Sequence, residues 1–255
     1  MKVWLNRLVF AIQFMTRIPI RANVDVEREE LPRIAAFFPV VGLCVGAFSA
    51  LLAWAAHFLG YSLFTSAAAV LGSALITGGL HIDGLCDSFD ALGSSRTRDQ
   101  MLEIMKDSRL GTMGGIALVF DILLKVLLYS RLSPDFSAFS DYLLIAAVPI
   151  AGRLMLCTGT TMSKCARPGG MGSLFIDGMG WPDLIRCSAL TFALLLAFAG
   201  FFRALSSIVL LPLAGWLVSA LVSKKLGGIT GDTMGMLNEL GELLFLITAI
   251  AGGAA

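Results

Sequence analysis

The sequence predicts an all-α fold: a polytopic integral membrane helical bundle with about seven spans and an amphipathic surface helix at the N-terminus. Composition is the first observation, because 57% of the residues are hydrophobic and only 15% are charged. Soluble domains have roughly 45–50% apolar and about 25% charged residues. The second observation is that apolar stretches near the ~20 residues needed to cross a bilayer recur along the chain. No alternating strand pattern competes with them.

The first segment, from Val3 to Ile20, is predicted to lie on the membrane surface. Arg7 and Arg17 interrupt its apolar residues, and it lacks the small-residue cleavage site of a signal peptide. The apolar residues at helical spacing are Trp4, Leu8, Ile12 and Met15.

The predicted spans follow in order, within one membrane-embedded domain over 1–255. They cover about 34–56, 62–80, 112–131, 142–162, 184–201, 204–222 and 240–254. The last stretch is short and rich in Gly and Ala, so six spans remain an alternative.

The loops between spans predict the orientation. Three long polar loops, 81–111, 163–183 and 223–239, fall on the same side as the N-terminus. That side carries fourteen Lys and Arg residues and the opposite side only two, Arg131 and Arg203. The positive-inside rule therefore places the long loops in the cytoplasm, a reducing compartment that fits free cysteines. A net charge of +1 gives no reason to expect a nucleic-acid partner.

The first chemical motif is an acidic segment that starts the 81–111 loop. Asp83, Asp87 and Asp90 are spaced i, i+4 and i+7, so on a helix they share one face. Unpaired carboxylates at a membrane boundary are costly and usually functional, and Mg²⁺ binds through carboxylates together with substrate phosphates. The segment therefore predicts a metal site; the alternative is a solvated acidic loop.

The second motif is a basic pair ahead of the third predicted span. Lys106 and Arg109 lie one helical turn apart and could hold phosphate oxygens. They could equally be a positive-inside anchor, and spacing leaves both interpretations open. Glu103 and Asp107 are either metal ligands or the partners of these two cations.

The third motif is a glycine-rich segment followed by acids. Gly228 and Gly231 belong to a turn whose N–H groups could meet phosphate at the start of a helix. Asp232, Glu239 and Glu242 follow at i, i+7 and i+10, again on one helical face.

Five further charged residues lie in or near the predicted spans. Arg153 lies inside a predicted span and is a candidate partner for phosphate or carboxylate. Arg167 lies in a loop that could close over a substrate or be an ordinary turn. Asp121 and Lys125 are interpreted as a mutually neutralised pair. Arg17 receives no role from its spacing.

Several of these segments resemble the adenosylcobinamide-GDP ribazoletransferases, also called cobalamin-5′-phosphate synthases. The similar segments are 77–87, 102–111, 16–19, 38–42 and 227–232, in that family's order and over nearly the whole chain. Cys86 and Ser94–Ser95 depart from the family pattern, which often has Ala and Gly there. The resemblance implies a Mg²⁺-dependent enzyme of the bacterial inner membrane. Such an enzyme joins adenosylcobinamide-GDP to α-ribazole or its 5′-phosphate, giving adenosylcobalamin or its 5′-phosphate and GMP.

For that reaction we expect the two acidic motifs to supply metal ligands and a general base. The predicted metal ligands are Asp83, Asp87, Asp90, Asp232, Glu239 and Glu242. The predicted catalytic residues are Asp83, Asp87, Lys106, Arg109, Asp232 and Glu239. The predicted substrate-binding residues are Lys106, Arg109, Arg153, Arg167, Gly228 and Gly231. Besides both substrates and the bilayer, a homo-oligomer and other cobalamin-assembly enzymes are open as partners.

Two other classes of protein share some of these features. CDP-alcohol phosphotransferases and aromatic prenyltransferases also place Asp-rich motifs at cytoplasmic helix ends, although Asp87 and Ser88 stand where the first class has Ala and Arg. An ion-coupled transporter would have acids near mid-span, and only Asp121 is placed deep in a predicted span.

Overall fold

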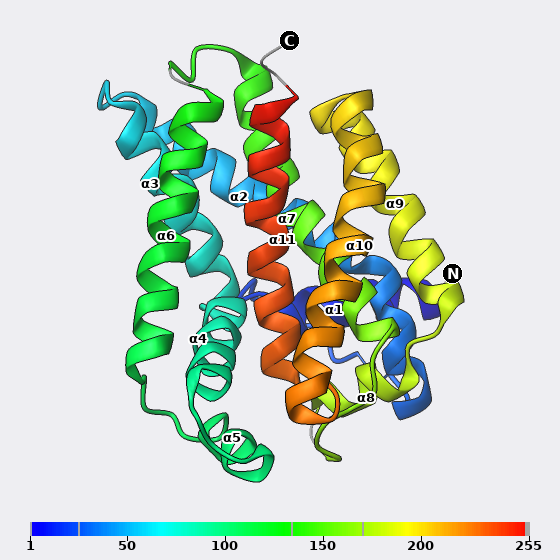
Figure 1. Ribbon diagram of the computed structural model, residues 1–255. Coiled ribbons are helices and arrows are strands. Elements are labelled where there is room, and N and C mark those ends of the chain that lie inside the picture. The colour runs from blue at the N-terminus through cyan, green and yellow to red at the C-terminus, as the bar shows by residue number, and fades with distance from the viewer. Residues whose placement is uncertain (1, 25, 134, 170, 253–255) are drawn as a thin grey trace.

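The computed structural model describes residues 2–24, 26–133, 135–169 and 171–252, and this part of the chain is built from helices (Figure 1). The elements are α1 Lys2–Met15, the 3₁₀ helix η1 Arg28–Phe37, α2 Phe38–His57, α3 Ser62–Thr77, α4 Leu80–Gly93, α5 Arg98–Ile104, α6 Thr112–Leu132, α7 Phe139–Thr161, α8 Met171–Gly178, α9 Trp181–Ala199, α10 Phe201–Leu226 and α11 Gly231–Ala251.

Six helical segments in the described residues are long and apolar enough to cross a membrane. They are η1 with α2, and α6, α7, α9, α10 and α11. Helices α3 and α4 qualify together as a seventh span, bent by 92°. The structure therefore confirms a polytopic all-α membrane protein. With 14 residues, α1 is shorter than the ~20 residues of a span, as expected for a surface helix.

The bend between α3 and α4 is made by two consecutive glycines. Gly78 has φ +63° and Gly79 has φ +74°, a left-handed conformation that costs other residues about 1–2 kcal/mol. Two such residues in a row end one helix and start the next in a new direction. The polar helix α4 consequently descends between α6 and α11.

Two predicted loops are shorter in the structure than the sequence indicated. Residues 80–93 form α4, and α11 begins at Gly231 instead of near residue 240. The start of α11 is capped by Thr230, whose hydroxyl oxygen accepts a hydrogen bond from the Thr233 N–H at 3.2 Å. Hydropathy placed the start of this span too late because its first turns carry Asp232, Glu239 and Glu242.

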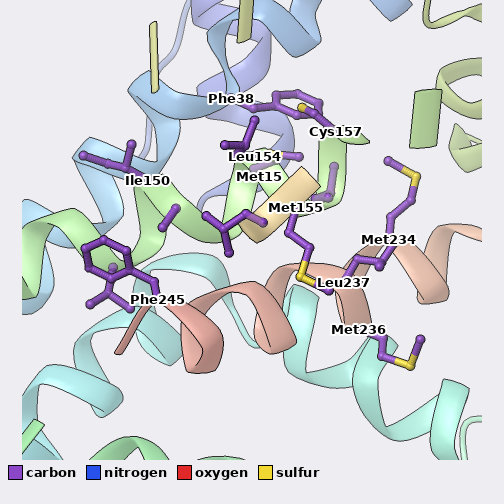
Figure 2. Packing of buried hydrophobic residues seen from close by; sticks show 14 of the residues in the cluster. Met15, Phe38, Ile150, Leu154, Met155, Cys157, Met234, Met236, Leu237 and Phe245 are labelled. Carbon is purple, nitrogen blue, oxygen red and sulfur yellow. The ribbon is translucent and has the colours of Figure 1, made fainter. Parts of the chain in front are cut away.

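Helix α7 lies at the centre of the bundle and contacts α2, α9, α10 and α11. Buried side chains of α7 and its neighbours, among them Phe38 of α2, Leu154 of α7 and Leu237 of α11, pack together there (Figure 2). The connections at α5, α8 and the turn from α10 to α11 lie together at one end of the bundle, at the bottom of Figure 1.

A buried ion cluster joins α6, α7 and α11. Lys125 lies 3.3 Å from an Asp121 oxygen and 3.0 Å from a Glu242 oxygen, and it also pairs with Glu239. Arg153 lies 2.9 Å from the other Glu242 oxygen. The predicted Asp121–Lys125 pair is thus present, within a larger group. All five side chains are buried, so each charge depends on the others for its solvation.

We expect the Lys125→Met variant to lower the free energy of unfolding by about 3–5 kcal/mol, because it leaves three buried carboxylates with Arg153 as their only cation. Thermal unfolding of the purified protein in detergent measures this. The control is Lys106→Met, which removes a cation from the exposed ion pair with Glu103 and should change the unfolding temperature little. Equal stability of the Lys125→Met variant and the native protein would contradict a structural role for the cluster.

Candidate active site

A polar cavity of about 600 Å³ opens at the bend between α3 and α4. Three parts of the chain surround it: the end of α1, the bend with the first turns of α4, and the segment that leads into α6. Its lining residues are Gln13, Phe14, Thr16, Arg17, Thr77, Gly78, Gly79, Leu80, Ile82, Asp83, Cys86, Asp87, Ser108, Leu110 and Leu118.

A second, apolar cavity of about 250 Å³ lies beside the first, and both are lined by Phe14, Leu80 and Asp83. Helices α8 and α11 form its other walls. Its remaining lining residues are Met15, His81, Gly84, Leu156, Met171, Gly172, Phe175, Gly231, Asp232, Met234 and Gly235. Asp83 therefore lies at the boundary between the polar cavity and the apolar cavity.

Asp83 and Asp87 lie on one face of α4, as the i, i+4 spacing predicted. Asp83 is exposed and Asp87 is half-buried. Neither carboxylate has a hydrogen bond or an ion pair with another side chain in the described ranges. Two unpaired carboxylates one turn apart repel each other, so this face favours a bound cation.

Asp232 reaches the same region because α4 and α11 touch. A Cβ atom at Gly84 would lie 2.6 Å from the backbone oxygen of Asp232, so only glycine permits this approach. Asp232 accepts a hydrogen bond from the Thr230 hydroxyl at 3.3 Å. Arg167 is near enough to act on the Asp232 carboxylate electrostatically, and its guanidinium donates to the Leu102 carbonyl oxygen at 3.3 Å.

Asp90 faces a different neighbour. Its two oxygens accept hydrogen bonds from the N–H groups of Gly111 at 2.7 Å and Gly114 at 2.8 Å. These are donors at the start of α6 that the helix itself leaves without partners. The structure thus separates the predicted trio: Asp83 and Asp87 line the polar cavity, and Asp90 caps α6.

Glu239 and Glu242 lie in the ion cluster, two and three turns along α11 from Asp232. At 1.5 Å per residue they are about 10 and 15 Å further along the helix axis. Arg153 belongs to the same cluster and is fully buried. The structure therefore places these three predicted site residues away from both cavities. In the described residues, no group of three or more His, Cys, Asp or Glu side chains could hold a metal ion by itself.

The predicted cations Lys106 and Arg109 are exposed and have local partners. Lys106 lies 3.2 Å from Glu103, and Arg109 lies 2.5 Å from Asp107. The hydrogen bonds from Arg109 hold the pKa of Asp107 low, at about 2. Ser108 and Leu110, in the same segment, line the polar cavity, so this segment forms its rim.

The predicted glycines have different positions. Gly231 lines the apolar cavity. Gly228 is packed against the 164–166 segment, beside a short backbone pairing in which the Ile229 N–H donates to the Lys164 carbonyl oxygen at 2.9 Å. It lines neither of the two cavities described above.

Arg17 is the site residue that spacing missed. Its guanidinium packs against Gly78, and its backbone N–H donates to the Ile76 carbonyl oxygen at 2.6 Å. Its side chain has no ion-pair partner in the part of the chain that the structure describes. It lines the polar cavity with Asp83 and Asp87. The only sequence signal for Arg17 was its place in the Thr16–Pro19 segment that carries the family resemblance.

Comparison with known proteins identifies the family of this chain. The family described as cobalamin-5-phosphate synthase matches residues 7–250. An adenosylcobinamide-GDP ribazoletransferase of Thermoanaerobacter pseudethanolicus is 40% identical over 97% of this chain and 98% of that protein. The enzyme of the same name from Caldanaerobacter subterraneus subsp. tengcongensis is 41% identical over 95% of this chain and 97% of that protein. No solved structure matches the chain. The extent of these matches shows that the chain belongs to the cobalamin-5-phosphate synthase family.

Proposed function

We propose that this protein joins adenosylcobinamide-GDP to α-ribazole or α-ribazole 5′-phosphate, forming adenosylcobalamin or its 5′-phosphate and releasing GMP. Membership of the family and the names of its relatives support the reaction. The polar cavity is the observation that carries the assignment to a site, because the side chains of Asp83, Asp87 and Arg17 line it and have no hydrogen-bond or ion-pair partner among the described residues.

The proposed reaction is a transfer between two oxygen atoms on phosphorus. A ribose hydroxyl oxygen of α-ribazole attacks the phosphorus atom on the cobinamide side of the diphosphate. The bond from that phosphorus to the bridging oxygen breaks, and GMP leaves with the bridging oxygen. The hydroxyl proton passes to a carboxylate. Such a reaction requires neutralisation of phosphate charge and alignment of the two oxygens.

The carboxylates at the cavity suit Mg²⁺ as a cofactor. Asp83 and Asp87 have oxygens free to act as ligands, and Asp232 lies across the α4–α11 contact. Mg²⁺ is commonly bound by one or two carboxylates together with substrate phosphates, so a complete protein cage is not required. Asp83 and Asp87 would hold the ion, which would offset charge on the phosphate oxygens.

The cations in this region would bind the remaining phosphate charge. Arg17 faces the cavity and can donate two parallel hydrogen bonds to one phosphate group. Lys106 and Arg109 at the rim would exchange Glu103 and Asp107 for the phosphate of the leaving nucleotide. Arg167 lies near enough to Asp232 to act on its carboxylate electrostatically.

Asp232 is our proposed acceptor of the hydroxyl proton, because it lines the apolar cavity next to the shared residue Asp83. Glu239, Glu242 and Arg153 would act indirectly, by fixing α11 and hence Asp232. The charge bias of the loops supports placing this site on the cytoplasmic face of the bacterial inner membrane.

We expect the Asp87→Asn variant to lose at least about 100-fold in the rate of GMP release, since the acidic face loses charge needed to hold a cation. Release of GMP from adenosylcobinamide-GDP, with α-ribazole and Mg²⁺ present, measures the rate. The matched control is Asp99→Asn, an exposed acid at the start of α5 that should leave the rate unchanged. Native-like turnover by the Asp87→Asn variant, or release of CMP from a CDP-alcohol by the native protein, would contradict the proposal.

We expect the Arg17→Ala variant to raise KM for adenosylcobinamide-GDP about tenfold or more, because a charge-assisted bidentate contact is lost. KM for α-ribazole should change little. The Arg17→Lys variant keeps the charge without the planar donor pair. Its KM for adenosylcobinamide-GDP should therefore lie between those of the native protein and the Arg17→Ala variant. The control is Arg21→Ala, an exposed cation four residues later that does not line the cavity. A fall in kcat with both KM values unchanged would argue against phosphate binding by Arg17.

A further inference from the structure

The apolar cavity has a composition unlike that of the polar one beside it. Its walls include side chains that are almost entirely removed from solvent, namely Met15, Leu156, Phe175 and Met234. Two of these, Met15 and Met234, belong to the buried cluster drawn in Figure 2. Its carboxylates are Asp83 and Asp232, which reach it from α4 and α11. Such a space favours a ligand with an apolar body and a polar end.

Two aromatic rings define one wall of the apolar cavity. Phe14 and Phe175 are stacked, with ring centroids 5.4 Å apart and planes 24° from parallel. Because these two rings already face each other, they would meet a flat apolar group edge-to-face, and methionine side chains adapt to the shape of what they contact. The occupant that suits these walls is a flat aromatic group.

The position of the apolar cavity fixes how such a ligand would lie. Because Asp83 and Phe14 line both cavities, the polar end of a molecule bound in one would lie beside a molecule bound in the other. Attack on a diphosphate requires a hydroxyl at this junction. A cavity of about 250 Å³ suits a small heterocycle and is far too small for a corrin ring.

We propose that the apolar cavity binds the benzimidazole base of α-ribazole, with its ribose directed to Asp83 and Asp232. This inference rests on the proposed function. It assigns the two substrates to separate cavities: the acceptor base to the apolar one and the diphosphate of the donor to the polar one. It also explains why Asp232, on the apolar side, is placed to receive the hydroxyl proton.

The test uses Met171, which lines only the apolar cavity and is 48% exposed, so that a larger side chain there is compatible with folding. The Met171→Trp variant should raise KM for α-ribazole at least about 30-fold by filling the cavity. The Met171→Ala variant should raise it about threefold through lost contact. Neither should change KM for adenosylcobinamide-GDP. Equilibrium dialysis of labelled α-ribazole, without the second substrate, should show the same loss of binding.

The matched control is Met113→Trp, at an exposed methionine of α6 that lines neither cavity and should leave both KM values unchanged. An unchanged KM for α-ribazole in both Met171 variants, or an equal rise in both substrates' KM values, would overturn the assignment. Failure of the native protein to release GMP from adenosylcobinamide-GDP would instead overturn the proposed function. The two failures are therefore distinguishable.

Discussion

The ion pairs of Lys125 connect three helices that are otherwise held by apolar contacts. Within the membrane, apolar side chains gain little by leaving lipid for protein, so helix positions depend on packing and on polar contacts. Lys125 on α6 reaches Glu239 and Glu242 on α11, and Arg153 on α7 holds the second of these glutamates. Lys125 has Asp121 as a partner on its own helix, but Glu239, Glu242 and Arg153 form their ion pairs only when the three helices are in place. The orientation of α11, and with it the position of Asp232, depends on this cluster.

Glycines at the helix contacts let the helices approach closely enough to bring the residues of the candidate site together. A Cβ atom at Gly152 would lie 2.8 Å from the Asn238 carbonyl oxygen, and one at Gly172 would lie 2.8 Å from the Cα atom of Gly231. With Gly84 against Asp232, these contacts bring α4, α7 and α8 to the first turns of α11. Small residues let helix backbones approach closely, and here the approach brings Asp232 to the cavity that Asp83 also lines.

The sequence predicted the class of fold, most spans and the acidic face of α4, because these depend on local hydropathy and helical spacing. It did not predict the partners of Glu239 and Glu242, since Lys125 lies more than 100 residues away and only packing brings the residues together. The start of α11 was predicted too far along the chain for the same reason. The acids lower the hydropathy of its first turns, although their partners from distant parts of the sequence keep these turns buried. Arg17 was missed because its importance comes from the left-handed Gly78 against which it packs.

The break between α3 and α4 explains why the cavity can exist beside apolar spans. Irregular backbone at membrane depth requires protein or a water-filled cavity around it, because lipid offers no hydrogen bonds. Gly78 and Gly79 form the break and also line the polar cavity, so the feature that would be costly in lipid is the one that faces the site. The polar helix that follows can then expose Asp83 and Asp87 to that cavity, while Asp90 secures the start of α6. A straight helix through the same residues would have had to turn its acidic face towards lipid or towards the apolar core.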